Sequence, residues 1–126
     1  MCLFVCLLTL SVFCLALLCV AQCILASEKK ERAALSLATP AAAEFDVPVA
    51  MVMAVMRTES GFRTNAVSQA GAKGLMQLMP DTFRWLSDSL AHEKLDDGMI
   101  YDPQTNIRYG CRYLRWLYNR YGDITA

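Results

Sequence analysis

The sequence predicts a mainly α-helical chain in which a hydrophobic N-terminal helix precedes one small helical domain. Residues 2–26 form an uncharged, mostly apolar run. Apolar residues also recur at three- and four-residue steps around Val52 to Glu59 and again around Ile107 to Tyr121, which is the helical period. A length of 126 residues allows one small domain at most.

The first 26 residues predict export or a membrane anchor. About 20 apolar residues span a bilayer, whereas the apolar core of a secretory signal has ~7–15 and follows a basic segment that is missing here. Ala26 is a small residue that suits a cleavage site. We expect 1–26 to be a cleaved signal peptide or an uncleaved N-terminal membrane anchor. Either places the rest of an exported bacterial protein in the periplasm or cell envelope.

The charged residues all follow this segment and cancel, with 12 basic and 12 acidic side chains. There is no excess of basic residues that would suggest nucleic acid as a partner. Residues 27–44 are expected to be a short helical lead-in that opens with a charged stretch. Thr39-Pro40 should interrupt it, and Ala41 to Phe45 could resume as a short helix.

Five of the six cysteines lie in the apolar segment, where they behave as small apolar residues. They are Cys2, Cys6, Cys14, Cys19 and Cys23. Only Cys111 lies beyond it, and one cysteine cannot form an internal disulfide. We expect Cys111 to be a core residue rather than a nucleophile, because no nearby cationic pair suggests an activated thiol.

The next helix is expected to run from about Val47 to Ser60. Asp46 is a plausible N-cap, and Pro48 suits the first turn. Gly61 is the natural residue to end the helix.

Glu59 is the candidate general acid on this helix. It shares a stripe with Val52, Val55 and Met56, so the apolar face ends in a carboxylate. Burial and the helix C-terminus would both favour its protonated form, which a general acid needs. The alternative is a solvated glutamate beside Arg57.

The following loop places the Gln77 amide among apolar neighbours, which are Leu75, Met76, Leu78 and Met79. A buried amide must be hydrogen-bonded. Its partner is either the backbone or a polar ligand such as a sugar amide or hydroxyl. Gly71 and Gly74 indicate backbone that bends sharply or lies close to something.

Residues 81–90 then predict a helix with Phe83, Leu86 and Leu90 on one face. Trp85 is expected to pack against helices, with sugar stacking as the alternative. His92 is isolated in a polar stretch, so we assign it to the surface and expect no metal site.

The last helix is expected to open with Asp102 as cap and Pro103 in the first turn, and to end at Gly122. Its core stripe is Ile107, Gly110, Leu114, Leu117 and Tyr121. Gly110 should let another backbone approach closely.

Three ordered blocks together resemble the catalytic core of the soluble lytic murein transglycosylases, whose fold is similar to goose-type lysozyme. They are Glu59-Ser60-Gly61-Phe62, then Ser68 with Gly71-Ala72-Lys73-Gly74-Leu75-Met76-Gln77-Leu78-Met79-Pro80, then Asp102-Pro103-Gln104-Thr105-Asn106-Ile107-Arg108-Tyr109-Gly110-Cys111-Arg112-Tyr113-Leu114. The resemblance implies a lysozyme-like (goose-type) domain over 45–126. The family's later Ala-Tyr-Asn-Ala-Gly segment does not follow, so this domain is expected to be incomplete at its C-terminus.

The resemblance also implies an activity. Its substrate is the β-1,4 bond between N-acetylmuramic acid and N-acetylglucosamine in peptidoglycan, and the product carries a 1,6-anhydro ring. Glu59 would be the single acid and base, Ser60 would help to orient it, and Met76 with Gln77 would line the cleft. No metal or organic cofactor is implied. The partners would be glycan strands, with residues 2–26 as a possible membrane tether.

Two other functions remain open. One is a lysozyme-like muramidase that uses Glu59 but transfers the sugar to water. The other is a non-catalytic, membrane-tethered glycan binder that keeps the motif without a complete cleft.

Overall fold

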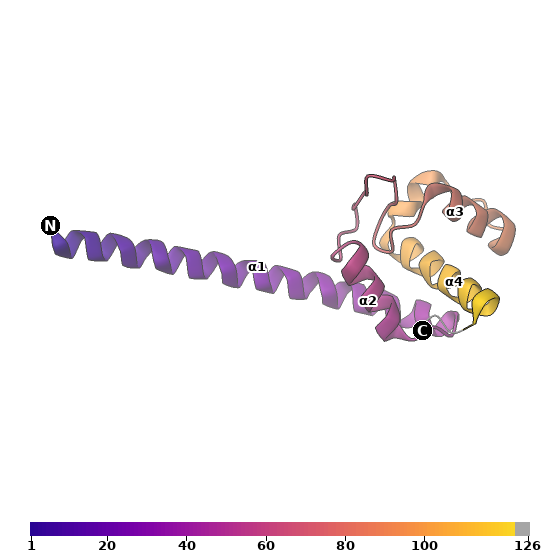
Figure 1. The fold of residues 1–126 in the computed structure, drawn as a ribbon, viewed down its shortest axis with the longest axis horizontal. Coiled ribbons are helices and arrows are strands. Elements are labelled where there is room, and N and C mark those ends of the chain that lie inside the picture. Colours follow the sequence, from indigo (N-terminus) through magenta and orange to yellow (C-terminus); the bar gives the residue numbers. More distant parts are fainter. Residues whose placement is uncertain (123–126) are drawn as a thin grey trace. The chain divides into compact units, whose positions relative to one another are not determined.

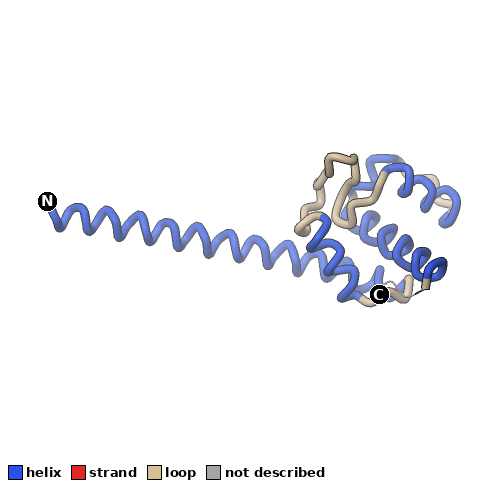
Figure 2. The backbone as a smooth tube through the Cα atoms, in the orientation of Figure 1, coloured by secondary structure: helices blue, strands red, loops and turns tan. Residues whose placement is uncertain are grey.

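The computed structural model describes residues 1–122, and these are mainly helical, as predicted (Figures 1 and 2). The elements in chain order are α1 (Cys2–Glu44), α2 (Val49–Glu59), α3 (Pro80–Trp85), the π-helical turn η1 (Leu86–Ala91), the 3₁₀ segment η2 (Asp97–Tyr101) and α4 (Pro103–Tyr121). A long loop joins α2 to α3 (Figure 2). It carries two isolated β-bridges, Val67 with Lys73 and Lys73 with Leu78.

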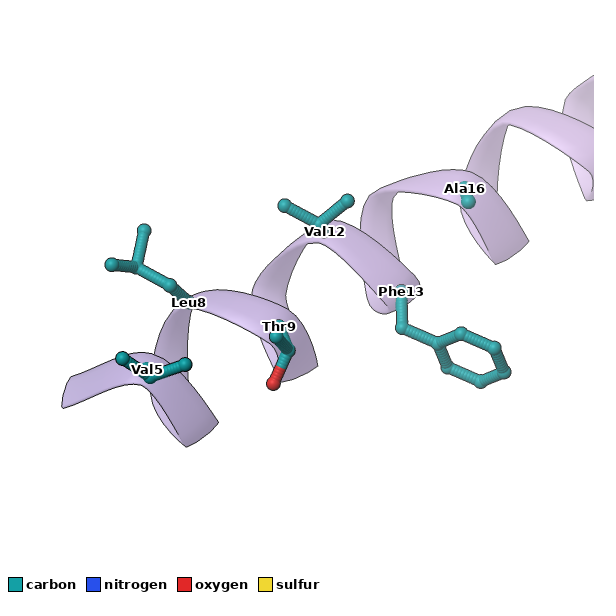
Figure 3. Close-up of a pocket in the computed structure, with 6 residues that line it drawn as sticks. All are labelled: Val5, Leu8, Thr9, Val12, Phe13 and Ala16. Carbon is teal, nitrogen blue, oxygen red and sulfur yellow. The ribbon is translucent and has the colours of Figure 1, made fainter. Parts of the chain in front are cut away.

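The chain divides into two compact units, Met1–Arg32 and the residues from Ala33 onward. The first is helix alone, and its large apolar side chains are exposed. By length and composition this helix could cross a membrane, and a signal sequence would pass the same test. One stretch of it, with Val5, Leu8 and Val12 projecting from successive turns, forms a shallow apolar hollow (Figure 3).

The predicted interruption at Thr39-Pro40 is wrong, because α1 continues through Pro40 to Glu44. Proline in a helix removes one backbone hydrogen bond. Here the cost is offset by burial: Ala38 and Ala42 are 0% and 2% exposed in the core of the second unit. Tertiary packing therefore outweighs the local breaker.

Asp46 does not cap the following helix, so that prediction is also wrong. Its φ of 51° places it in a left-handed turn, and its carboxylate accepts from Arg115 of α4. The helix begins later, at Val49, and Pro48 provides no side-chain cap. The predicted end is confirmed: Gly61 adopts φ 57°, and its N–H donates to the Arg57 carbonyl at 3.2 Å.

The core of the second unit joins α3 to α4. The rings of Phe83 and Tyr109 meet edge to face with centroids 5.2 Å apart. Trp85 meets Trp116 in the same way at 4.9 Å, so it packs against a helix, as expected. Buried apolar residues that surround these contacts include Val52, Met56, Leu75, Met76, Leu78, Leu86, Ile100, Ile107 and Cys111.

The start of α4 follows its prediction. Asp102 Oδ2 accepts from the Thr105 N–H at 2.9 Å, which is the expected N-cap, and Pro103 occupies the first turn. The core position predicted for Tyr121 is wrong, because this residue is 73% exposed in the last turn of α4. Leu90, expected on one helix face with Phe83 and Leu86, is 37% exposed in the π-helical η1.

Candidate active site

Glu59 is the last residue of α2, and its side chain is exposed. The expected burial is therefore wrong. The buried stripe of this helix advances in four-residue steps from Val52 to Met56 and on to Ser60, whose exposed fraction is 1%. Glu59 lies one residue before that stripe, so it faces outward. A carboxylate in this position is accessible to a large polar substrate.

Ser60 bonds to the helix rather than to Glu59 in this structure. Its Oγ donates to the Met56 carbonyl at 3.0 Å. Its own carbonyl accepts from both the backbone N–H and the side-chain Nε of Arg63, at 3.2 and 3.0 Å. Ser60 thus fixes the turn that presents Glu59.

The Gln77 side chain bonds to the backbone of its own loop. Its Nε2 donates to the Ala66 carbonyl at 3.1 Å and to the Gly74 carbonyl at 2.9 Å. Gln77 also has φ 50°, a left-handed conformation that few non-glycine residues adopt. Of the two partners expected from sequence, the backbone is therefore the one seen here. A contact with substrate remains a proposal.

Met76 lies next to Gln77 and is 6% exposed. Its N–H donates to Asn106 Oδ1 at 2.7 Å, across thirty residues of sequence. The side chain packs on Gly110, where an added Cβ would lie 2.6 Å from Met76 Cγ. A close approach was predicted for Gly110, but it is made by the Met76 side chain and not by a backbone.

Asn106 is the site residue to which sequence reasoning gave no role. It is 0% exposed, and its Nδ2 donates to the carbonyls of Lys73 at 3.1 Å and Ile100 at 2.7 Å. The available signal was a polar residue directly before Ile107, at the start of the core stripe of α4. A polar residue at the edge of such a stripe must find partners within the fold.

A series of backbone bonds connects the Glu59 turn to the loop of Met76 and Gln77. The Ala66 N–H donates to the Arg63 carbonyl at 3.4 Å, and the Gly74 N–H donates to the Ala66 carbonyl at 2.9 Å. Arg63 in turn bonds to Ser60. These hydrogen bonds therefore connect the turn that carries Glu59 and Ser60 to the loop that carries Met76 and Gln77. Asn106 links this loop to α4.

A second polar cluster joins α4 to the segment before η2. Arg108 pairs with Glu44 at 2.9 Å and with Glu93 at 3.4 Å, while Tyr109 Oη donates to Glu93 Oε2 at 2.5 Å. The hydrogen bond from Tyr109 lowers the pKa of Glu93 most, and the positive charge of Arg108 lowers it further. Burial and the Glu93 bond raise the pKa of Tyr109 to about 12.

Cys111 and the acidic groups offer little for covalent or metal chemistry. Burial raises the pKa of the Cys111 thiol to about 12, so it is not an activated nucleophile. His92 is exposed, as expected. Within residues 1–122, no group of three or more His, Cys, Asp or Glu side chains is arranged to hold a metal ion.

The sequence matches the model of a family described as the transglycosylase SLT domain over residues 36–126. A curated relative, the soluble lytic murein transglycosylase of Escherichia coli strain K12, is 34% identical over 79 residues. The match covers 62% of this chain and 12% of the relative. The membrane-bound lytic murein transglycosylase C of Cronobacter sakazakii is 34% identical over 108 residues, covering 78% of this chain and 28% of the relative.

Solved structures show the same likeness. The 70 kDa soluble lytic transglycosylase of Escherichia coli superposes with a TM-score of 0.64 at 32% identity, covering 69% of this chain and 14% of that one. An inactive glutamate-to-glutamine mutant of the lytic transglycosylase Slt from Pseudomonas aeruginosa gives 0.63 at 32% identity, covering 72% and 14%. This chain thus spans a small part of the length of these relatives.

Proposed function

We propose, from the premise that this chain belongs to the transglycosylase SLT domain family, that it carries a peptidoglycan lytic transglycosylase site with Glu59 as the catalytic acid and base. The observation that carries the proposal is the position of Glu59. Its exposed carboxylate ends α2 within the matched region, and Ser60 and Arg63 hold the turn that presents it.

The proposed reaction needs one carboxyl group and no water. Glu59 would give its proton to the glycosidic oxygen as the bond from that oxygen to the sugar's C1 breaks. The sugar's own C6 hydroxyl oxygen would then bond to C1, and its proton would return to the Glu59 carboxylate. The product is a 1,6-anhydro ring, and Glu59 ends the cycle protonated.

The roles of the other candidate carboxylates favour this one-acid reaction. Glycosidases that use two acids place a second carboxyl group ~5–9.5 Å from the first. The candidates from sequence have other partners: Asp81 pairs with Arg84 at 2.8 Å, Asp102 caps α4, and Asp88 is exposed beside Ser87. One relative is described as inactive after a glutamate-to-glutamine change, which supports a central role for a glutamate in this family.

Ser60, Met76 and Gln77 are proposed to shape the substrate site. Ser60 would act by fixing the turn that presents Glu59. Met76 and Gln77 would form the wall of the cleft beside that turn, held in place by their hydrogen bonds to Asn106 and to the Ala66 carbonyl. The substrate would be peptidoglycan glycan strands at the cell envelope. Residues 2–26 would bring the chain there, as an export signal or as a tether, and a membrane-bound relative supports this location.

The test is Glu59→Gln in the full chain, with Asp88→Asn as the matched control. Both changes remove one exposed carboxylate, and only the first should abolish release of fragments from purified peptidoglycan. Mass analysis of the products decides the reaction, because an anhydro product lacks one water relative to the hydrolysis product. Hydrolysis products would establish the muramidase instead. Unchanged cleavage by Glu59→Gln would refute the proposal and leave glycan binding as the function to measure.

A further inference from the structure

We propose that Asn106 is a positioning residue for this site: it fixes the segment that carries Met76 and Gln77 to α4 and so sets the affinity for glycan. The inference rests on the proposed function. Asn106 lies on α4 and is fully buried, yet its side chain forms three hydrogen bonds to main-chain groups of other segments.

Both donors and the carbonyl oxygen of the Asn106 amide are hydrogen-bonded. An asparagine side chain offers two N–H donors and a carbonyl acceptor. Oδ1 accepts from Met76, and the two Nδ2 hydrogens go to Lys73 and Ile100, at 2.7 to 3.1 Å. A buried donor or acceptor that loses its partner is destabilising. The loop therefore has one favoured position against α4.

The fit around Asn106 is tight. A Cβ added to Gly74 would lie 2.3 Å from Asn106 Nδ2 and 2.9 Å from the Ile100 carbonyl oxygen. Gly74 also has φ 79°, which favours glycine. The loop thus passes directly over the Asn106 amide, in contact with it.

A few hydrogen bonds connect this contact between Gly74 and Asn106 to the candidate site. Met76 is bonded to Asn106 and precedes Gln77, and the Gln77 N–H and side chain both donate to the Gly74 carbonyl. Gly74 also bonds to Ala66, which leads to the Glu59 turn. A shift of this loop would displace the proposed wall of the cleft.

Asn106→Asp separates positioning from mere packing. It keeps the volume and the acceptor for the Met76 N–H but removes both donors. A carboxylate oxygen would then face the Lys73 and Ile100 carbonyls. Asn119→Asp, an exposed change on the same helix, is the control for added charge on α4.

The experiment uses the full chain of each variant. Circular dichroism and thermal melting establish the folded fraction at the assay temperature, and initial rates on purified peptidoglycan give kcat and KM. We expect folded Asn106→Asp to show KM raised about tenfold, with a smaller change in kcat, because ground-state contacts are lost. Asn119→Asp should match the parent. A kcat that falls in proportion to the folded fraction at constant KM, or no change, would overturn the proposal.

Amide hydrogen exchange gives a readout that does not depend on catalysis. In the parent, the Met76 amide should exchange as slowly as amides in the middle of α4, and Asn106→Asp should accelerate exchange over 73–78 while α2 stays protected. Fast exchange at Met76 in the parent would refute the proposal even if the variant failed to fold. A parent that exchanges as expected but does not cleave peptidoglycan would refute the proposed function alone.

Discussion

Gly110 of α4 lies directly against Met76, so that a Cβ at position 110 would approach the Met76 Cβ, Cγ and Cε atoms to between 2.6 and 2.8 Å. Of these atoms, Cβ is attached directly to the backbone, so a rotamer change of Met76 would not relieve its overlap. The absence of a side chain at Gly110 is therefore what allows the loop to contact α4.

Gly110→Ala should destabilise the protein. Alanine is the better helix former, but overpacking of this contact typically costs ~1–3 kcal/mol, which outweighs ~1 kcal/mol of helix propensity. We expect a lower melting temperature, measured by circular dichroism. Adding Met76→Ala should recover part of the loss relative to Met76→Ala alone. Equal effects of Gly110→Ala in both backgrounds would show that the contact is not the cause.

Tyr109→Phe should lower stability by about 1 kcal/mol near neutral pH, because a buried ring loses its bond to Glu93. The effect should depend on pH. The folded pKa of Glu93 lies below its ordinary value, chiefly through the Tyr109 bond. Its stabilisation is therefore present above the unfolded pKa of ~4.3 and is lost as the pH falls through the folded pKa.

The measurement is urea unfolding of the parent and Tyr109→Phe across this pH range. The gap between their free energies of unfolding should narrow from about pH 4.3 downward. Tyr121→Phe, at an exposed ring in the same helix, serves as the control and should match the parent throughout. A gap that stays constant with pH would mean that Glu93 is not the partner that matters.

Cys111 should resist alkylation in the folded protein. It is 0% exposed, and burial raises its pKa to about 12, so little reactive thiolate is present near neutral pH. Iodoacetamide labelling, read by peptide mass analysis, should modify Cys111 only after denaturation. The same thiol labelled in denaturant provides the reference. Rapid labelling of Cys111 without denaturant would show that the core around α4 opens readily.

Local signals in the sequence predicted three of the helix ends. Gly61 and Gly122 end helices with positive φ, and Asp102 caps α4, because each depends on its own few residues. The apolar periods likewise indicated a mainly helical chain. These features need no information about distant parts of the sequence.

Features that depend on distant residues were missed. Asp46 looks like an N-cap, but Arg115, from the other end of the domain, holds it in a turn. Pro40 looks like a breaker, but burial of neighbouring alanines keeps the helix intact. Similarly, packing decided that the buried stripe of α2 continues from Met56 to Ser60 and not to Glu59. The hydrogen-bond partners of Asn106 lie up to 33 residues away in the sequence.

The apolar part of α1 leads to the last prediction, which concerns Leu15. Leu15 lies near the middle of the uncharged run and is 66% exposed. A charged residue at the centre of a membrane-inserted helix costs ~2.5–3.5 kcal/mol on insertion scales. Leu15→Arg should therefore reduce delivery of the chain to the cell envelope, whether 1–26 acts as a cleaved signal or as an anchor.

Fractionation of a bacterial host that expresses the full chain tests this prediction. The parent should be found in the envelope or periplasm and Leu15→Arg in the cytosol, whereas Leu15→Ala, which removes bulk without adding charge, should follow the parent. The intact mass of the delivered parent then distinguishes the two roles, since a cleaved signal leaves a chain that begins near Ser27. Leu15→Arg that fractionates with the parent would contradict the prediction that a charge at this position limits delivery.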